Sequence, residues 1–504
     1  MKDPSVPWRL QAASFFCGAA VMIMELTGSR LVAPFLGTSL IVWTALIGVI
    51  MMSLCLGNWI GGHVADRRPE AKILARVLMA AALVTALTAL GANALLAWAS
   101  GASFSLYAAA VVAALVAFAP ASVLMGMCPP IIARLAMCDV ASSGATVGRL
   151  SALNSAGSIL GTFLGGFVLI SFFPSGVILI GVAAGLMALS LVVYAATWRG
   201  ILLLAALVGL SGWTCAYGLP MAPVGVHIDT RYNHISIVES RMSDGRRVRI
   251  MMTDPDGAQS VMCVESPTDL ISDYTKFYDL AFHFKPDAKK ILMLGGGGWC
   301  VPRHVLAERD VSFDVVELDP GMTEAARTYF GVPDGPAVQI YHEDARTFLA
   351  RAARDGLGPW DAVFMDVFGS WYSIPFHMAT VEAAGRVRDV LAPDGVLVVN
   401  VISALYGPRS GVFHGIWSAF SRAFPKMMIF PASAPDPRYA QARQNLMIVA
   451  LRSDEDPPVP PAPEPGIARL LSHQWIEPFV PDPRVPAFTD AFAPVERWAL
   501  AQGL

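Results

Sequence analysis

Residues that could do chemistry follow four predicted strands in the second half of the sequence. An apolar strand, ILML, runs into consecutive glycines, and each of the next three strands ends beside a carboxylate. The groups are Gly295, Gly296, Gly297 and Gly298, then Glu317 with Asp319, then Asp344 with Ala345, and last Asp366. In a parallel sheet the carboxyl ends of the strands share one edge, where ligands bind. The order of these groups therefore predicts a single site.

The spacing of these groups favours a ligand with one ribose. Glycines let a backbone approach a ligand closely. Glu317 follows them by about 20 residues, from where a carboxylate can accept hydrogen bonds from ribose hydroxyls. The run lacks the GxGxxG spacing of a dinucleotide fold. A nucleoside without a pyrophosphate, such as S-adenosylmethionine, fits better.

An alternation of strands and helices positions these groups. We predict strands at 290–294, 312–318, 337–341, 360–366, 395–402, 426–430 and 445–451, with helices such as 320–330 and 377–391 between them. This order indicates an α/β, Rossmann-like sheet. Before it, strands at 234–239 and 247–252 flank Ser243-Asp244-Gly245, which predicts a β-hairpin. The expected units are a substrate-side hairpin subdomain at 223–285, a catalytic domain at 286–455, and a proline-rich linker with a C-terminal tail at 456–504.

The first 222 residues are predicted to form a polytopic α-helical membrane domain. The chain of 504 residues is 55% hydrophobic and only 15% charged, against about 25% charged in an average soluble protein. About seven segments are long enough to cross a bilayer at roughly 20 residues each; they are 10–33, 38–61, 75–98, 104–127, 149–173, 175–197 and 200–218. We therefore expect a multi-pass protein of the cell (inner) membrane that contacts the lipid bilayer.

Two features of these segments suggest close helix contacts. Gly157, Gly161 and Gly165 recur at every fourth position and place a smooth face on one helix, which serves tight packing or a substrate path. Glu25 lies within the first segment, where a carboxylate costs roughly 2.5 to 3.5 kcal/mol. It is expected to face protein or water, with Arg30 or Asn58 as a partner, in a structural or a functional role.

Loop charges predict a cytoplasmic N-terminus, because basic residues gather in alternate loops. Seven crossings would then place the catalytic domain outside, whereas S-adenosylmethionine is made inside. The side that this domain faces is left open. A net charge of −3 gives no sign of nucleic-acid binding. Seven scattered cysteines without a CxxC or Cys/His cluster predict neither disulfides nor a metal site.

The motifs of the second half resemble the spermidine synthase (polyamine aminopropyltransferase) family, in the branch with an N-terminal membrane domain. The resemblance spans about residues 226–452; its motifs are Leu294-Gly-Gly-Gly297, Val316-Glu317-Leu-Asp319-Pro320, Asp344-Ala345-Arg346 and Trp360-Asp-Ala-Val-Phe-Met-Asp366. It implies that the glycines Gly295, Gly296 and Gly297 and the ribose ligand Glu317 bind the donor, that Asp344 and Ala345 hold the adenine, and that Asp366 is the base. The implied substrate-side residues are Gln259 and Tyr274, and Trp371 and Tyr372 are further substrate-side candidates because aromatic residues crowd the same loops.

The sequence departs from the family at three acidic positions. The family motif Gly-Gly-Gly-Asp-Gly reads Gly-Gly-Gly-Gly298-Trp299 here, Gly369 replaces an acceptor-side aspartate, and Tyr-His-Glu has become Tyr-Thr-Lys276. A charge-assisted hydrogen bond contributes roughly 1.5 to 3 kcal/mol, so diamine binding should be weakened. The loss also makes undecarboxylated S-adenosylmethionine a plausible donor. The aromatic residues Trp299, Trp371, Tyr372 and Phe376 suit either a less polar acceptor or ordinary packing.

Three functions remain open. The first is a membrane-bound transferase that moves an aminopropyl-type group from S-adenosylmethionine or its decarboxylated form to an amine. The second is methyl or 3-amino-3-carboxypropyl transfer, or donor cleavage, with a non-polyamine or lipid-like acceptor. The third is a ligand-gated transporter or sensor without catalysis. The resemblance also suggests a homodimer.

Overall fold

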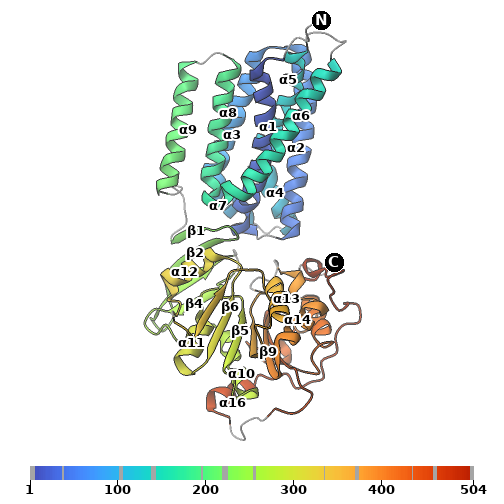
Figure 1. Cartoon of the computed structure of the whole chain (residues 1–504). Coiled ribbons are helices and arrows are strands. Elements are labelled where there is room, and N and C mark those ends of the chain that lie inside the picture. The colour runs from blue at the N-terminus through green and yellow to red at the C-terminus, as the bar shows by residue number, and fades with distance from the viewer. Residues whose placement is uncertain are drawn as a thin grey trace. The chain divides into compact units, whose positions relative to one another are not determined.

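The structure is a computed structural model of the chain. It describes residues 6–36, 39–101, 106–137, 143–194, 197–217, 225–253, 257–333, 335–368, 374–433, 435–457 and 463–499. The chain divides into two compact units, Met1–Val224 and Gly225–Leu504. Figure 1 shows the first unit as helices and the second as a sheet covered by helices. The predicted fold class, an apolar helical domain followed by an α/β domain, is confirmed.

The first unit is built from long apolar helices. They are α1 (Trp8–Leu36), α2 (Leu40–Arg67), α3 (Ala71–Gly101), α4 (Leu106–Ala117), α5 (Ala119–Ala136), α6 (Ser143–Phe163), the π-helical turn η1 (Leu164–Leu169), α7 (Ile170–Phe172), α8 (Ser175–Val193) and α9 (Trp198–Tyr217). Within the described residues, six helices are long and apolar enough to cross a membrane, and the apolar stretches Tyr107–Ala117 and Trp198–Thr214 are shorter. These six are consistent with a membrane-spanning domain.

One of the seven predicted spans differs from the helices in the structure. The predicted span at 104–127 is divided between α4 and α5, which meet at Phe118. Hydrophobicity continues through this position, whereas the helix is interrupted there, next to a proline in the first turn of α5. The predicted span at 200–218 corresponds to the continuous helix α9.

Glycines bring α1 and α6 into direct backbone contact. A Cβ atom at Gly157 would overlap the carbonyl oxygen of Phe15, and one at Gly161 would lie 2.5 Å from the carbonyl oxygen of Ala19. A Cβ atom at Gly165 would make ordinary contact with Leu26, at 3.4 Å. The first two glycines of the predicted motif therefore set the distance between these helices.

A second glycine pair, which the sequence reading missed, does the same between α2 and α5. A Cβ atom at Gly57 would overlap the carbonyl oxygen of Val123, and one at Gly61 would lie 2.6 Å from that of Met127. The two glycines are four residues apart, so they share one face of α2. Close approach of helices at small residues is thus a repeated feature of this unit.

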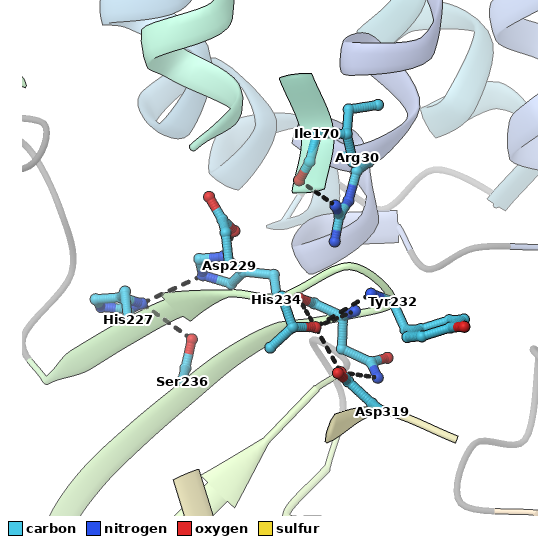
Figure 2. A network of polar contacts seen from close by, with 10 residues as sticks. Arg30, Ile170, His227, Asp229, Tyr232, His234, Ser236 and Asp319 are labelled. Atoms are coloured by element: carbon cyan, nitrogen blue, oxygen red, sulfur yellow. Dashed lines mark hydrogen bonds and ion pairs between the residues drawn. The ribbon is translucent and has the colours of Figure 1, made fainter. Parts of the chain in front are cut away.

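The two predicted partners of Glu25 both make other contacts. Arg30 donates from Nη1 to the carbonyl oxygen of Ile170 at 3.3 Å (Figure 2). Asn58 donates to the carbonyl oxygen of Leu54, in its own helix, at 3.0 Å. The pairing of Glu25 with either residue stays a prediction.

The second unit contains two sheets. The first is antiparallel, in the order β1 (Val226–Asp229), β2 (His234–Arg241), β3 (Arg247–Met252) and β4 (Ser260–Cys263), and it includes the predicted hairpin between β2 and β3. The second has seven strands in the order β10-β11-β9-β8-β5-β6-β7. Their bounds are β5 (Lys290–Leu294), β6 (Ser312–Val316), β7 (Val338–Tyr341), β8 (Trp360–Met365), β9 (Leu391–Ser403), β10 (Lys426–Pro431) and β11 (Gln444–Leu451).

The larger sheet is buried on both faces. Strands β5 to β9 pair in parallel, β11 pairs antiparallel with β9, and β10 pairs antiparallel with β11. Leu292 and Leu294 face one apolar cluster, and Ile291 and Met293 face another. The helices on the first side are α13 (Ala345–Asp355), α14 (Val381–Val390) and α15 (Gly411–Phe420), and those on the second side are α10 (Leu280–Phe284), α11 (Cys300–Glu308) and α12 (Pro320–Phe330). A continuous apolar run such as ILML is what a doubly covered parallel strand requires.

The end of the chain joins the same core. Two short helices, α16 (Pro465–Leu471) and α17 (Val495–Ala499), lie in this C-terminal part of the chain. Phe488 and Val495 are fully buried in the cluster that contains Leu294. The segment that the sequence presents as a tail therefore contributes to the core of the second unit. The boundaries at 222, 285 and 455 stay predictions.

We expect Gly157→Ala to destabilise the protein, because its methyl group would overlap the backbone of α1. Overpacking of this kind costs about 1 to 3 kcal/mol. Thermal unfolding of the detergent-solubilised chain measures the effect. Gly148→Ala, in the same helix but with open space around it, is the control and should leave the midpoint unchanged or raise it slightly, because alanine favours a helix more than glycine does. Equal midpoints for both variants would contradict the close contact.

Candidate functional site

Glycine conformations allow the ends of β5 and β8 to meet. Gly295 has φ of 92° and Gly297 has φ of 48°, a region that L side chains rarely adopt. A Cβ atom at Gly295 would also lie 2.5 Å from the carbonyl oxygen of Asp366. The loop after β5 can therefore lie directly against Asp366 only because it is made of glycine.

Trp299 follows this loop in an unusual conformation. Its φ is 60°, and it is the one non-glycine residue with positive φ in the described part of the chain. Its side chain is fully buried in the cluster around α11. Burial of a large aromatic side chain offsets the cost of about 1 to 3 kcal/mol for such a backbone. Trp299 is thus a core residue and not part of an aromatic acceptor surface.

Glu317 lies just past the end of β6 and binds the glycine loop. Its Oε2 accepts hydrogen bonds from the backbone N–H groups of Gly296 (2.9 Å) and Gly297 (3.2 Å), and its Oε1 accepts one from the N–H of Asp319 (3.0 Å). Burial raises the pKa of Glu317, and these three donors oppose the rise. Each carboxylate oxygen can accept more than one hydrogen bond, so Glu317 keeps the capacity to bind hydroxyl groups.

A separate hydrogen-bond network fixes the loop that carries Glu317. Asp319 caps α12 by accepting from the N–H of Gly321 at 2.9 Å. Its Oδ2 also accepts from the hydroxyl group of Thr230 (2.5 Å) and from the side-chain amide of Asn233 (3.0 Å), in the turn between β1 and β2 (Figure 2). The small antiparallel sheet is thereby attached to the carboxyl edge of the large one.

Asp366 follows β8 and accepts hydrogen bonds from neutral donors. The side-chain amide of Asn400 donates to Oδ1 at 2.9 Å, and the hydroxyl group of Tyr274 donates to Oδ2 at 3.2 Å. The side-chain amide of Asn445 in turn donates to Oδ1 of Asn400 at 2.9 Å. Burial raises the pKa of Asp366, and the Asn400 and Tyr274 donors oppose this rise.

One cavity of about 280 Å³ joins these groups. Its lining includes two carboxylates, Glu317 and Asp366, and contains no lysine, arginine or histidine among the residues that the structure describes. The remaining polar lining residues are Thr253, Gln259, Ser260, Ser272, Tyr274, Thr275, Cys300, Asn400 and Asn445. Two carboxylates without a neighbouring cation give the cavity a negative potential, which favours a cationic ligand.

Most of the predicted site residues lie in this cavity. They are Gly295, Gly296, Gly297, Glu317, Asp366, Gln259 and Tyr274. Asp344 and Ala345 do not line it. Asp344 caps α13 by accepting from the N–H of Thr347 (3.0 Å) and contacts Nε2 of His377 at 3.0 Å. The His377 hydrogen bond lowers the pKa of Asp344.

The predicted acceptor-side aromatic residues are only partly described. Trp371 and Tyr372, with Gly369, lie outside the described residues. Phe376 is 47% exposed and does not line the cavity. Lys276 pairs with Asp273 at 2.8 Å and also does not line it. Lys276, which stands where the family has an acidic residue, therefore forms its ion pair with Asp273 outside the cavity lining.

Sequence reasoning missed Ser260, Asn400 and Asn445. Ser260 accepts from the N–H of Gly298 at 2.9 Å, and a Cβ atom at Gly298 would lie 2.6 Å from Cβ of Ser260. Ser260 of β4 therefore occupies the space that a side chain at position 298 would need, where the family has an aspartate. Asn400 interrupts an otherwise apolar strand, which is the one sequence signal that could have found it, whereas Asn445 lies at the polar start of β11.

Comparisons with known proteins agree with the motifs. No family model matches the chain. It is similar to a polyamine aminopropyltransferase of Vibrio vulnificus, with 33% identity over 141 residues that cover 27% of this chain and 46% of that protein. It is also similar to polyamine aminopropyltransferase 1 of Streptomyces coelicolor, with 23% identity over 435 residues that cover 80% of this chain and 77% of that protein. The first match spans about half of the Vibrio protein, whereas the second is longer than the whole second unit.

Among solved structures, the chain is similar to one described as a probable spermidine synthase from Corynebacterium glutamicum. The TM-score is 0.41 with 18% identity, and the match covers 56% of this chain and 96% of that one. The fold and the site define the second unit as an α/β unit with a cavity at the carboxyl edge of its sheet. The curated relatives confirm the predicted resemblance to the polyamine aminopropyltransferase family.

We expect Asp366→Asn to raise the apparent melting temperature at pH 8. Burial raises the folded-state pKa of Asp366 above its ordinary value of 3.8. A raised pKa means that folding favours the protonated form, so stability is lost as the pH rises through the folded-state pKa. The neutral amide avoids that loss, and its advantage should shrink as the pH falls towards 3.8. Scanning fluorimetry at several pH values measures the difference.

The control for this comparison is Asp310→Asn, because Asp310 is fully exposed at the surface. An exposed ion pair contributes little to stability, so this variant should follow the wild type at every pH. A wild type that is more stable than Asp366→Asn at pH 8 would contradict a desolvated carboxylate at 366.

Proposed function

We propose that the protein is a membrane-bound transferase that moves an aminopropyl-type group from an S-adenosylmethionine derivative to an amine. One observation carries the proposal. A desolvated carboxylate, Asp366, borders a cavity whose other wall holds Glu317 on a glycine loop, and no described residue of the lining is a cation. A sulfonium nucleoside matches this arrangement in charge.

In this proposal Glu317 accepts hydrogen bonds from the ribose hydroxyl groups of the donor. Its Oε atoms are already oriented by three backbone N–H groups, so little ordering is left for the ligand to impose. The glycine loop lies between Glu317 and Asp366. A donor whose ribose is bound at Glu317 therefore extends its sulfonium group towards Asp366.

Asp366 serves as the base in the proposed reaction. The nitrogen lone pair of the acceptor amine attacks the carbon next to the sulfonium sulfur, so that a C–N bond forms and the C–S bond breaks. The bonding electrons stay on sulfur, and methylthioadenosine leaves as a neutral thioether. The proton of the new ammonium passes to the carboxylate of Asp366. A base with a raised pKa holds this proton better than an ordinary aspartate.

The donor and the acceptor are the finer parts of the proposal. Ser260 occupies the space beside Gly298, where the family has an aspartate for the ammonium group of the donor. This neutral wall supports a second candidate, in which S-adenosylmethionine itself donates a 3-amino-3-carboxypropyl or a methyl group. We propose a small amine or an amine-bearing, lipid-like molecule as the acceptor, and a homodimer in the bilayer as the assembly. Asp344 and Ala345 remain proposed adenine contacts, and Trp371 and Tyr372 remain proposed acceptor contacts.

Product analysis tests this function. Purified full-length protein is incubated with an amine mixture and either S-adenosylmethionine or its decarboxylated form. Methylthioadenosine supports propyl-group transfer, provided that the alkylated amine appears with it. S-adenosylhomocysteine would instead show methyl transfer. Donor binding without any product would favour a sensor or transporter and would contradict the proposal.

We expect Asp366→Asn to lower the rate of methylthioadenosine formation by about 10² to 10⁴-fold, the usual contribution of a general base. Donor affinity, measured by calorimetry, should also fall, because the neutral amide no longer attracts the sulfonium group, so the rates are compared at saturating donor. Asp310→Asn again serves as the control. Full activity of Asp366→Asn would show that the base lies elsewhere.

We expect Glu317→Gln to act on binding instead of on the chemical step. Losing a charged acceptor removes roughly 1.5 to 3 kcal/mol, so donor affinity should fall by about ten- to a hundredfold. The rate at saturating donor should change little. Glu308→Gln, on the partly exposed end of α11, is the matched control. Unchanged donor affinity in Glu317→Gln would contradict its role at the ribose.

A further inference from the structure

Two asparagines adjoin Asp366 on strands that carry none of the recognised motifs. Asn400 lies in β9 and is 1% exposed, and Asn445 lies at the start of β11, which pairs antiparallel with β9. Both side chains reach the cavity. A buried amide in the middle of an apolar strand, such as Asn400, is costly unless it is hydrogen-bonded, so this position needs a reason.

The hydrogen bonds of the two amides run in one direction. Asn445 donates to the carbonyl oxygen of the Asn400 side chain at 2.9 Å, and Asn400 donates to Oδ1 of Asp366 at 2.9 Å. A side-chain amide has one accepting end and one donating end. Because Asn445 occupies the accepting end of Asn400, the donating end must face Asp366. The reverse orientation would bring two oxygen atoms together.

We propose that Asn445 and Asn400 are positioning residues that fix the Asp366 carboxylate as the base of the proposed transfer. Asn400 anchors Oδ1 to the rigid centre of the sheet, and Asn445 sets the orientation of Asn400. The Oδ2 atom, which has the longer bond of 3.2 Å to Tyr274, is left to accept the proton of the amine. The inference rests on the proposed function, because it names how the same site prepares its base.

Neutral donors suit this task better than a cation. The ionisable groups that face Asp366 in the described structure are Tyr274 and Tyr278 from η2 (Asp273–Asp279), Cys300 from α11 and Glu317 beyond β6. Burial raises the pKa values of Tyr274 and Tyr278 well above 10, so both stay neutral. A lysine or arginine beside Asp366 would stabilise its ionised form more strongly but would repel a sulfonium donor and weaken the base. Amides orient the carboxylate without either effect.

The sharpest test is Asn445→Asp, which keeps the size of the side chain and reverses its hydrogen bonding. The new carboxylate should draw the amino group of Asn400 towards itself and turn its carbonyl oxygen towards Asp366. The Asp366 anion then loses a donor and gains a repulsive neighbour. We expect the acid limb of the pH–rate profile to move to higher pH by about one unit, which means about a tenfold lower rate on that limb. Asn445→Ala should move it less, in the same direction.

The control is Gln339→Glu, which adds one negative charge on the exposed face of β7, at the opposite edge of the sheet. It should keep the acid limb of the wild type. An acid limb that is the same in Asn445→Asp, Gln339→Glu and the wild type would overturn the inference. Should Asn445→Asp not fold, the same comparison is made with Asn445→Ala.

Binding measurements separate this inference from the proposed function. Ionised Asp366 attracts the sulfonium group, so the affinity for S-adenosylmethionine should fall as the pH drops through the pKa of Asp366. Calorimetry should place that midpoint at higher pH in Asn445→Asp than in Gln339→Glu, whether or not a product forms. If the wild type forms no product, the proposed transfer is contradicted. If the pH midpoint of donor binding is the same in Asn445→Asp and Gln339→Glu, the positioning role is contradicted.

Discussion

The burial of one carboxylate without a cationic partner is the constraint on which the site depends. Taking an ionised aspartate out of water is costly, and proteins usually meet the cost with a paired charge. At Asp366 the structure supplies two neutral donors, from Asn400 and Tyr274, and leaves the cavity lining without a basic group among the described residues. The site thus keeps an anion that lacks its counter-charge. A cationic substrate would supply it.

The backbone makes this arrangement possible. The loop after β5 passes so close to Asp366 that a side chain on Gly295 would meet the backbone of that residue. The same loop donates two N–H groups to Glu317. Through this loop the ends of three adjacent strands, β8, β5 and β6, are fixed relative to one another. The geometry between the two carboxylates is therefore set by strand pairing and not by flexible side chains.

Part of this site could be predicted from the sequence, because the parallel strands order their carboxyl ends along one edge. From that rule the glycines at 295–297, Glu317 and Asp366 were predicted to lie in one site, and all of them line the cavity. It could not find Asn400 and Asn445, since their approach depends on the antiparallel pairing of β9 with β11, which no local pattern specifies. It also could not show that Ser260 closes the space beside Gly298, because β4 belongs to a different sheet. In the helical unit, the glycine spacing at Gly157 predicted a close contact, whereas the same spacing at Gly57 passed unnoticed.

The most direct measurement of the central claim is a structure of the full chain with bound S-adenosylmethionine. The account predicts the ligand in the cavity between Glu317 and Asp366, with the ribose hydroxyl groups bonded to Glu317 and the carbon beside the sulfonium facing the carboxylate of Asp366. A ligand bound elsewhere, or one whose sulfonium group points away from Asp366, would contradict it.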